Sequence, residues 1–218
     1  AGNAGPSATT ANYEVETLVP TISSVTASWG AYLNATEDDS SGTVTVVTSD
    51  AENSQTVTVS LNGTNYTGTV SDNSTTVTIA ASGLQALTDG SSYQLNTNVS
   101  DVAGNAATEN TGTSFTYDKT SPTLAETTLV PSLTNDNSTQ YTFSSSEGGT
   151  ISIGGSCSSD NSTAVADNMT VSFADLEDGT YSNCSITVAD SAGNTQTITV
   201  NSFTIDIIAP TLSQVTAV

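Results

Sequence analysis

The chain has 218 residues, enough for one large or two ordinary domains, and 35% of them are hydrophobic. Lys119 is the single basic residue against 22 acidic ones, there is no His, and the formal net charge is −21. Because phosphate binding needs Lys and Arg, this balance argues against nucleic acid and against anionic membrane surfaces as partners. The acidity favours cations, either as a screening atmosphere or as bound Ca²⁺, or else it serves solubility in salty surroundings.

A triplet, Ala-Gly-Asn, recurs along the chain and defines an internal repeat. It stands at residues 1–3, 103–105 and 192–194, and the last two copies belong to the pentapeptide Asp-x-Ala-Gly-Asn. A Pro-Thr-aliphatic step follows each central Gly after 18, 18 and 17 residues, and an acid stands four positions before each Pro. The prolines are Pro20, Pro122 and Pro210, and the acids are Glu16, Asp118 and Asp206. The spacing from Pro to Pro, 102 and then 88 residues, is the length of an immunoglobulin-like domain.

The repeat divides the chain into four segments. Residues 1–17 are predicted to be the last turn and strand of a preceding repeat, or a strand donated to a neighbouring subunit. Residues 18–119 and 120–207 are predicted to be two domains, and residues 208–218 the first strand of a following repeat. Since the sequence opens on Ala1 rather than Met, we expect a processed product or a cut fragment. No apolar run approaches the length of a membrane span, so we expect no membrane insertion.

Alternation of apolar and polar residues predicts the strands. In the first repeat they are expected at 43–48, 56–61, 66–70, 75–80, 93–100 and 114–118. Asn62-Gly63 is a hairpin signal between the second and third of them. Residues 29–41 are an insertion that is either a longer loop or an extra strand. In the second repeat strands are expected at 140–145, 150–153, 169–173, 181–189 and 196–205.

About seven short strands per repeat, with frequent turn signals, favour a sandwich over a barrel or a solenoid. We therefore predict an all-β protein made of tandem immunoglobulin-like Greek-key β-sandwiches. An apolar residue, Asp-Gly and then Tyr recur at 87–93 and at 176–181. This pattern fits a tyrosine corner, in which the hydroxyl binds nearby backbone, and the alternative is an ordinary turn followed by a buried aromatic residue.

Short motifs along the whole chain also carry a family resemblance. They are Val57-Thr-Val-Ser-Leu-Asn-Gly-Thr-Asn-Tyr66, Leu87-Thr-Asp-Gly90, Asp101-Val-Ala-Gly-Asn105, Phe115-Thr-Tyr-Asp118, Gly155-Ser-Cys157, Leu176-Glu-Asp-Gly-Thr-Tyr181, Cys184 and Asp190-Ser-Ala-Gly-Asn194. In this order and spacing they resemble the bacterial Ig-like repeats of large biofilm-associated and RTX-type surface adhesins. The resemblance implies an extracellular fold, repeated many times in a long, secreted bacterial surface protein, with a second repeat that looks like a disulfide-bearing relative.

Both cysteines, Cys157 and Cys184, fall in the second repeat. Aligning Asp190 with Asp101 places Cys184 at the inward position of Leu95, and Cys157 follows a strand expected to neighbour that one. A disulfide is therefore sterically reasonable and would be compatible with secretion. Two unpaired thiols or a metal site remain as alternatives.

A catalytic site is not expected. The chain has no His and only one basic residue, which excludes most mechanisms of acid–base catalysis and of nucleophilic catalysis with a base. A glycosidase-like carboxylate pair stays formally open, on Glu14 with Glu16 or in the loop 37–39, but neither pair has apolar neighbours in sequence to raise a pKa. We expect no enzyme and no required cofactor.

Calcium is the one ion that we expect. If the Asp-x-Ala-Gly-Asn turn and the acid before Pro lie at the same end of a repeat, their oxygens form a hard-ligand site. The hypothesis places Asp101 and Asp118 at the first hinge, helped by Asn105 or by Asp136 in the loop 135–137, and Asp190 with Asp206 at the next hinge. The alternative is that these residues only shape their turns.

We expect a structural spacer in an extracellular adhesin, stalk or filament, with neighbouring Ig-like repeats of the same or identical chains as partners. One rival is a binding module in which Trp29 and Tyr32 of the insertion engage a glycan or a cell-surface protein. The alternative for these two residues is a structural role within the insertion. The other is a subunit of a head-to-tail filament assembled by β-strand complementation.

Overall fold

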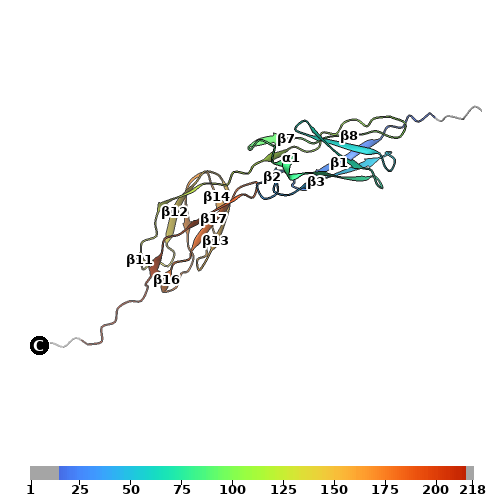
Figure 1. Ribbon diagram of the computed structural model, residues 1–218. Helices are drawn as coiled ribbons and strands as arrows, with labels where there is room; N and C mark the ends of the chain where they lie inside the picture. Colours follow the sequence, from blue (N-terminus) through green and yellow to red (C-terminus); the bar gives the residue numbers. More distant parts are fainter. Residues whose placement is uncertain (1–14, 215–218) are drawn as a thin grey trace, which may run out of the picture. The chain divides into compact units, whose positions relative to one another are not determined.

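The computed structural model describes residues 15–214 (Figure 1). Its regular structure is almost entirely β, because strands rich in Val and Thr bury every second side chain. In β3 (Gly42–Ser49) the side chains of Val44 and Val46 are fully buried. The side chains of Thr45, which lies between them, and of Val47, which follows them, are exposed. This is the period of two that the sequence shows. The one helix of the described part, α1 (Ala81–Leu84), is a single turn.

The described chain divides into two compact units. The first consists of residues up to Gly30 with 41–84 and 93–114, and the second of 31–40, 85–92 and 115 onward. The second unit thus includes three segments that belong to the first sequence repeat.

The first unit contains two antiparallel three-stranded sheets, with strand orders β1-β3-β6 and β5-β4-β8. The strands besides β3 are β1 (Thr21–Ala27), β4 (Thr56–Leu61), β5 (Thr64–Thr69), β6 (Ser74–Ile79) and β8 (Asn96–Val99). Their inward rows, among them Val57, Val59, Val77 and Ile79, are fully buried and form the core of a sandwich. The turn between β4 and β5 is the expected hairpin, since Asn62 and Gly63 have φ angles of 49° and 78°.

The second unit has four sheets, ordered β10-β12-β15, β14-β13-β17-β18, β11-β19-β16 and β2-β9-β7. Its strands are β2 (Tyr32–Leu33), β7 (Ser91–Tyr93), β9 (Phe115–Tyr117), β10 (Leu124–Thr128), β11 (Leu133–Thr134), β12 (Gln140–Ser145), β13 (Gly149–Gly154), β14 (Thr163–Ala164), β15 (Asp167–Ser172), β16 (Gly179–Tyr181), β17 (Ser185–Ala189), β18 (Thr195–Thr199) and β19 (Phe203–Ile205). β2 pairs in parallel with β9, and β11 pairs in parallel with β19. Buried aromatic residues fill the core, and the Phe203 ring stacks on Tyr181 and Phe173 with centroids 5.3 and 6.2 Å apart.

The predicted all-β sandwich fold is confirmed, and each predicted strand overlaps an observed one. Three of the long predicted strands are interrupted: 93–100 becomes the end of β7 and β8, 181–189 becomes the end of β16 and β17, and 196–205 becomes β18 and β19. The insertion at 29–41 holds the short strand β2 within turns.

The terminal predictions lie mostly outside the described residues. Of the segment 1–17, residues 15–17 are described and form no strand, and of the segment 208–218, residues 208–214 form none. Among residues 15–214, no helix has both the length and the apolar character that crossing a membrane requires.

Candidate functional site

Three carboxylates come together in the second unit. Asp118 follows β9, Glu147 follows β12 and Asp190 follows β17, so three separate strand ends deliver them. One oxygen of each carboxylate lies within 4.8 Å of the others. Asp190 is 8% exposed and the other two are half-buried. We call these three residues the carboxylate cluster.

The turn that carries Asp190 holds its carboxylate in place. One oxygen, Oδ1, accepts hydrogen bonds from the backbone amides of Ala192 and Asn194 at 2.8 and 2.9 Å. The other, Oδ2, accepts from the side-chain amide of Asn194 at 2.9 Å. The same Nδ2 atom donates to the backbone carbonyl of Asp118, also at 2.9 Å. The turn and the segment bearing Asp118 are therefore fixed to each other.

The cluster concentrates negative charge. Burial, and next the charges of Asp118 and Asp190, raise the pKa of Glu147. Burial, and after it the charges of Asp190 and Asp89, also raise the pKa of Asp118. Lys119, the one basic residue of the sequence, has its Nζ atom 5.7 Å from the centroid of the Tyr117 ring. Hard oxygen ligands held close together without a cationic side chain among them fit a divalent cation such as Ca²⁺.

The structure groups the predicted ligands differently from the hypothesis. The structure brings Asp118 to Asp190 and Glu147, whereas Asp101 hydrogen-bonds Asn105 in the first unit. The reason is topological: the Asp-x-Ala-Gly-Asn turn comes before the last strand of its repeat, and the acid comes after that strand. The turn of one repeat therefore meets the acid that ends the repeat before it.

The other predicted ligands make local turns. Asp206 Oδ1 accepts from the amide of Ile208 at 3.2 Å, and Asp136 Oδ1 accepts from the amide of Ser138 at 2.9 Å. Neither belongs to the carboxylate cluster. Glu147, which does, was absent from the sequence hypothesis. It is the first acid after the strand 140–145. This position would have indicated a ligand if the sequence had shown that this strand ends beside Asp118 and Asp190.

The first unit has a related arrangement. An open groove there is lined by eight residues, of which four are acidic: Glu16, Asp50, Glu52 and Asp101. Hydrogen bonds from Asn105, the side-chain bond first among them, lower the pKa of Asp101. Asp50 and Glu52 follow β3 as Glu147 follows β12.

Of the two residues of the hypothetical ligand platform, Trp29 is buried and Tyr32 is exposed. The Trp29 side chain is 7% exposed, and a Cβ placed at Gly42 would lie 2.5 Å from its ring, so glycine at position 42 makes room for the indole. The ring is part of the core of the first unit and presents no face to a sugar. Tyr32, at 39% exposure, remains on the surface.

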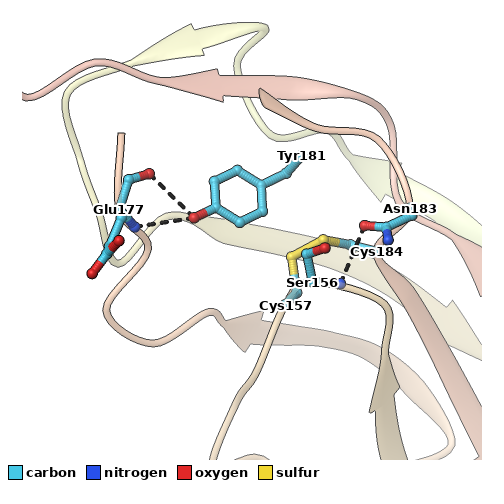
Figure 2. The surroundings of a disulfide bond; sticks show 6 residues. All are labelled: Ser156, Cys157, Glu177, Tyr181, Asn183 and Cys184. Atoms are coloured by element: carbon cyan, nitrogen blue, oxygen red, sulfur yellow. Dashed lines mark hydrogen bonds between the residues drawn. A yellow bond between two sulfur atoms is a disulfide. The ribbon is translucent and has the colours of Figure 1, made fainter. Parts of the chain in front are cut away.

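The predicted disulfide between Cys157 and Cys184 is confirmed, with Cα atoms 5.4 Å apart (Figure 2). Both cysteines are buried in the core of the second unit. Figure 2 also shows the Tyr181 hydroxyl between the backbone groups of Glu177: it donates to the carbonyl at 3.1 Å and accepts from the amide at 3.0 Å. The second repeat thus has the predicted tyrosine corner.

Comparison with known families gives a match within the second repeat. Residues 128–207 match the model of the bacterial Ig-like domain. A search of the curated proteins found no match.

Solved structures that resemble the chain include segments of large bacterial adhesins. One is a Ca²⁺-stabilised adhesin that helps an Antarctic bacterium reach out and bind ice, 24% identical over 87% of this chain and 50% of that one, with a TM-score of 0.45. Another is a bacterial immunoglobulin-like domain of the M. primoryensis ice-binding adhesin, 30% identical over 46% of this chain and 96% of that one, with a TM-score of 0.33. A third is a domain of a biofilm-associated protein, 20% identical over 87% of this chain and 31% of that one, with a TM-score of 0.29. The chain thus spans half the length of the first of these.

Proposed function

We propose that the chain is a structural spacer in an extracellular bacterial surface adhesin, with the repeats 18–119 and 120–207 as its domains. The match of residues 128–207 to the bacterial Ig-like domain supports this function. So does the disulfide, because such bonds persist in oxidising compartments. A chain with no His and one basic residue is poorly equipped for acid–base catalysis, so we propose a scaffold rather than an enzyme. Its partners are the neighbouring Ig-like repeats.

The finer proposal is that Ca²⁺ binds the carboxylate cluster and braces the chain where the first repeat ends. The single observation that carries it is the approach of Asp118, Glu147 and Asp190 to within 4.8 Å of one another. Three carboxylates that repel one another raise the free energy of the folded state, and a divalent cation reverses the sign of that interaction. Binding only to the folded state would then stabilise it.

Calorimetric titration of CaCl₂ into the chelator-treated chain tests the proposal. Glu147→Gln removes one charged ligand, and Glu177→Gln removes an exposed carboxylate outside the cluster as a matched control. We expect saturable heat that Glu147→Gln weakens and Glu177→Gln leaves unchanged. Equal titrations for all three proteins would mean that Ca²⁺ meets only the general negative charge of the chain.

A further inference from the structure

The two Asp-x-Ala-Gly-Asn turns form the same hydrogen bonds, residue for residue. In the first unit, Asp101 Oδ1 accepts from the amide of Asn105 at 2.7 Å and Asp101 Oδ2 from its side-chain amide at 2.8 Å. In the second unit, the corresponding distances between Asp190 and Asn194 are both 2.9 Å. The Asp of each turn thereby fixes the side chain of the Asn, and it uses one of the two hydrogens of that amide.

The second amide hydrogen points, in both turns, at the backbone that precedes the repeat. Asn194 Nδ2 donates to the carbonyl of Asp118 at 2.9 Å. Asn105 Nδ2 reaches the carbonyls of Glu16 and Leu18 at 3.3 and 3.4 Å. Glu16 and Asp118 are equivalent positions, since each is the acid four residues before the Pro that opens a repeat. In both repeats, therefore, the side-chain amide of the turn Asn donates to the backbone carbonyl of the acid that precedes the Pro.

A further segment of the second unit joins the second turn. Asn34 Nδ2 donates to the carbonyl of Ala192 at 2.8 Å, and the amide of Ala35 donates to Asn194 Oδ1 at 3.4 Å. Asn194 thus makes hydrogen bonds through both of its side-chain polar atoms, and it is 7% exposed. A buried amide with both polar atoms bonded costs more to displace than an exposed one, because leaving its partners unpaired carries a desolvation penalty.

We propose that the Asn of the Asp-x-Ala-Gly-Asn turn is a clamp that binds the main chain leaving the preceding repeat, and that it does so without a cation. The partner that this surface fits is an extended segment with an acid four positions before a Pro. The clamp acts through neutral amide and carbonyl groups, so salt and chelators leave it in place. It also positions the backbone of Asp118, whose carboxylate then lies beside Asp190.

The end of the second repeat presents the same acceptor. Asp206 Oδ1 accepts from the amide of Ile208 at 3.2 Å, as Asp118 Oδ1 accepts from the amide of Thr120 at 3.1 Å. Asp178 Oδ1 accepts from Ile207 as Asp89 Oδ1 accepts from Lys119, at 2.7 and 2.9 Å. The segment at Asp206 therefore has the local geometry of a clamped segment, and it fits the turn of a further repeat of the same kind.

Amide hydrogen exchange by NMR on the whole chain, in chelator, tests the clamp. In Asn194→Ala we expect exchange at Thr120 and Ala35 to become roughly five- to tenfold faster, the loss of about one net hydrogen bond. Exchange at Thr120 should then approach that at Ile208, which has the same local bond without the clamp. Asn98→Ala, on the exposed side of β8, is the matched control and should change neither amide.

Unchanged protection at Thr120 and Ala35 in a folded Asn194→Ala protein would overturn the clamp. Should that variant lose the fold of the second unit, Asn105→Ala repeats the test in the first unit, with the amide of Leu18 as the probe. Unchanged exchange at Leu18 would likewise overturn the proposal. Both variants keep all three carboxylates of the cluster, so calorimetric titration with CaCl₂ tests calcium binding separately from the clamp.

Discussion

The hydroxyl of Tyr117 donates a hydrogen bond to the carboxylate of Asp38, and both side chains are buried in the second unit. Asp38 lies in the insertion at 29–41, and Tyr117 belongs to β9, so 79 positions of sequence separate them. Burial, and next the bond to Asp38, raise the pKa of Tyr117. The bond ties the insertion to the strand that ends the first repeat.

Removing that hydroxyl should destabilise the second unit. Tyr117→Phe keeps the ring but leaves the Asp38 carboxylate without this donor, and hydrogen bonds to charged groups contribute about 1.5–3 kcal/mol. We expect a loss of that size in urea unfolding followed by circular dichroism. Tyr32→Phe, on an exposed neighbouring strand, is the control and should change the stability little. Equal stability of the two variants would show that Asp38 finds other partners.

The disulfide should contribute about 3.6 kcal/mol to the second unit alone. The estimate follows from the 27-residue separation of Cys157 and Cys184 and the chain entropy that the closed loop removes from the unfolded state. We expect the double variant Cys157→Ala with Cys184→Ala to lower the melting temperature of one calorimetric transition. A uniform shift of every transition would contradict this, because the first unit contains no cysteine.

The Tyr181 hydroxyl should contribute little more to stability than one net hydrogen bond, because both of its bonds lie at an exposed site. Tyr181→Phe keeps the stacking on Phe203 and removes the bonds to both backbone groups of Glu177. The expected loss is about 1 kcal/mol in the free energy of unfolding. Tyr181→Leu, which also removes the ring stacking, should cost more. If the Phe variant costs as much as the Leu variant, the hydroxyl holds the loop by itself.

Local rules of the sequence were enough for much of the fold. The alternation in β3 and β4, the Asn62-Gly63 hairpin and the corner at Tyr181 each depend on residues close together along the chain. The disulfide was predictable because internal alignment with Leu95 showed that Cys184 faces inward.

The site was less predictable, because it depends on which end of a repeat each loop occupies. Asp101 and Asp118 flank the same last strand in sequence, and the hypothesis placed them together, whereas the structure groups Asp118 with Glu147 and Asp190. The sequence left a structural role and a ligand platform open for Trp29, because the space for its ring is made by Gly42, thirteen positions away in β3. The burial of Asp38 depends on its bond to Tyr117, 79 positions away, so the loop 37–39 alone gave no sign of it.

The raised pKa values of Asp118 and Glu147 give the chain an unusual dependence on pH. A folded carboxyl with a raised pKa keeps its proton where the unfolded chain has lost it, so its stabilising contribution is present at low pH and disappears as the pH rises through the folded pKa. In chelator, the melting temperature of the second unit should therefore rise as the pH is lowered from neutrality toward the ordinary pKa values of these carboxyls.

Below about pH 4 both units should lose stability, because hydrogen bonds lower the pKa values of Asp89 and Asp101 and the contribution of these carboxylates is lost on protonation. Melting of the wild type, Glu147→Gln and Glu177→Gln at a series of pH values separates the cluster from the general charge of −21. Glu147→Gln should melt higher than the wild type near pH 7 in chelator and show a flatter slope, and Ca²⁺ should flatten the slope of the wild type. Identical slopes for the two Gln variants would mean that overall charge repulsion, and not the carboxylate cluster, sets the response to pH.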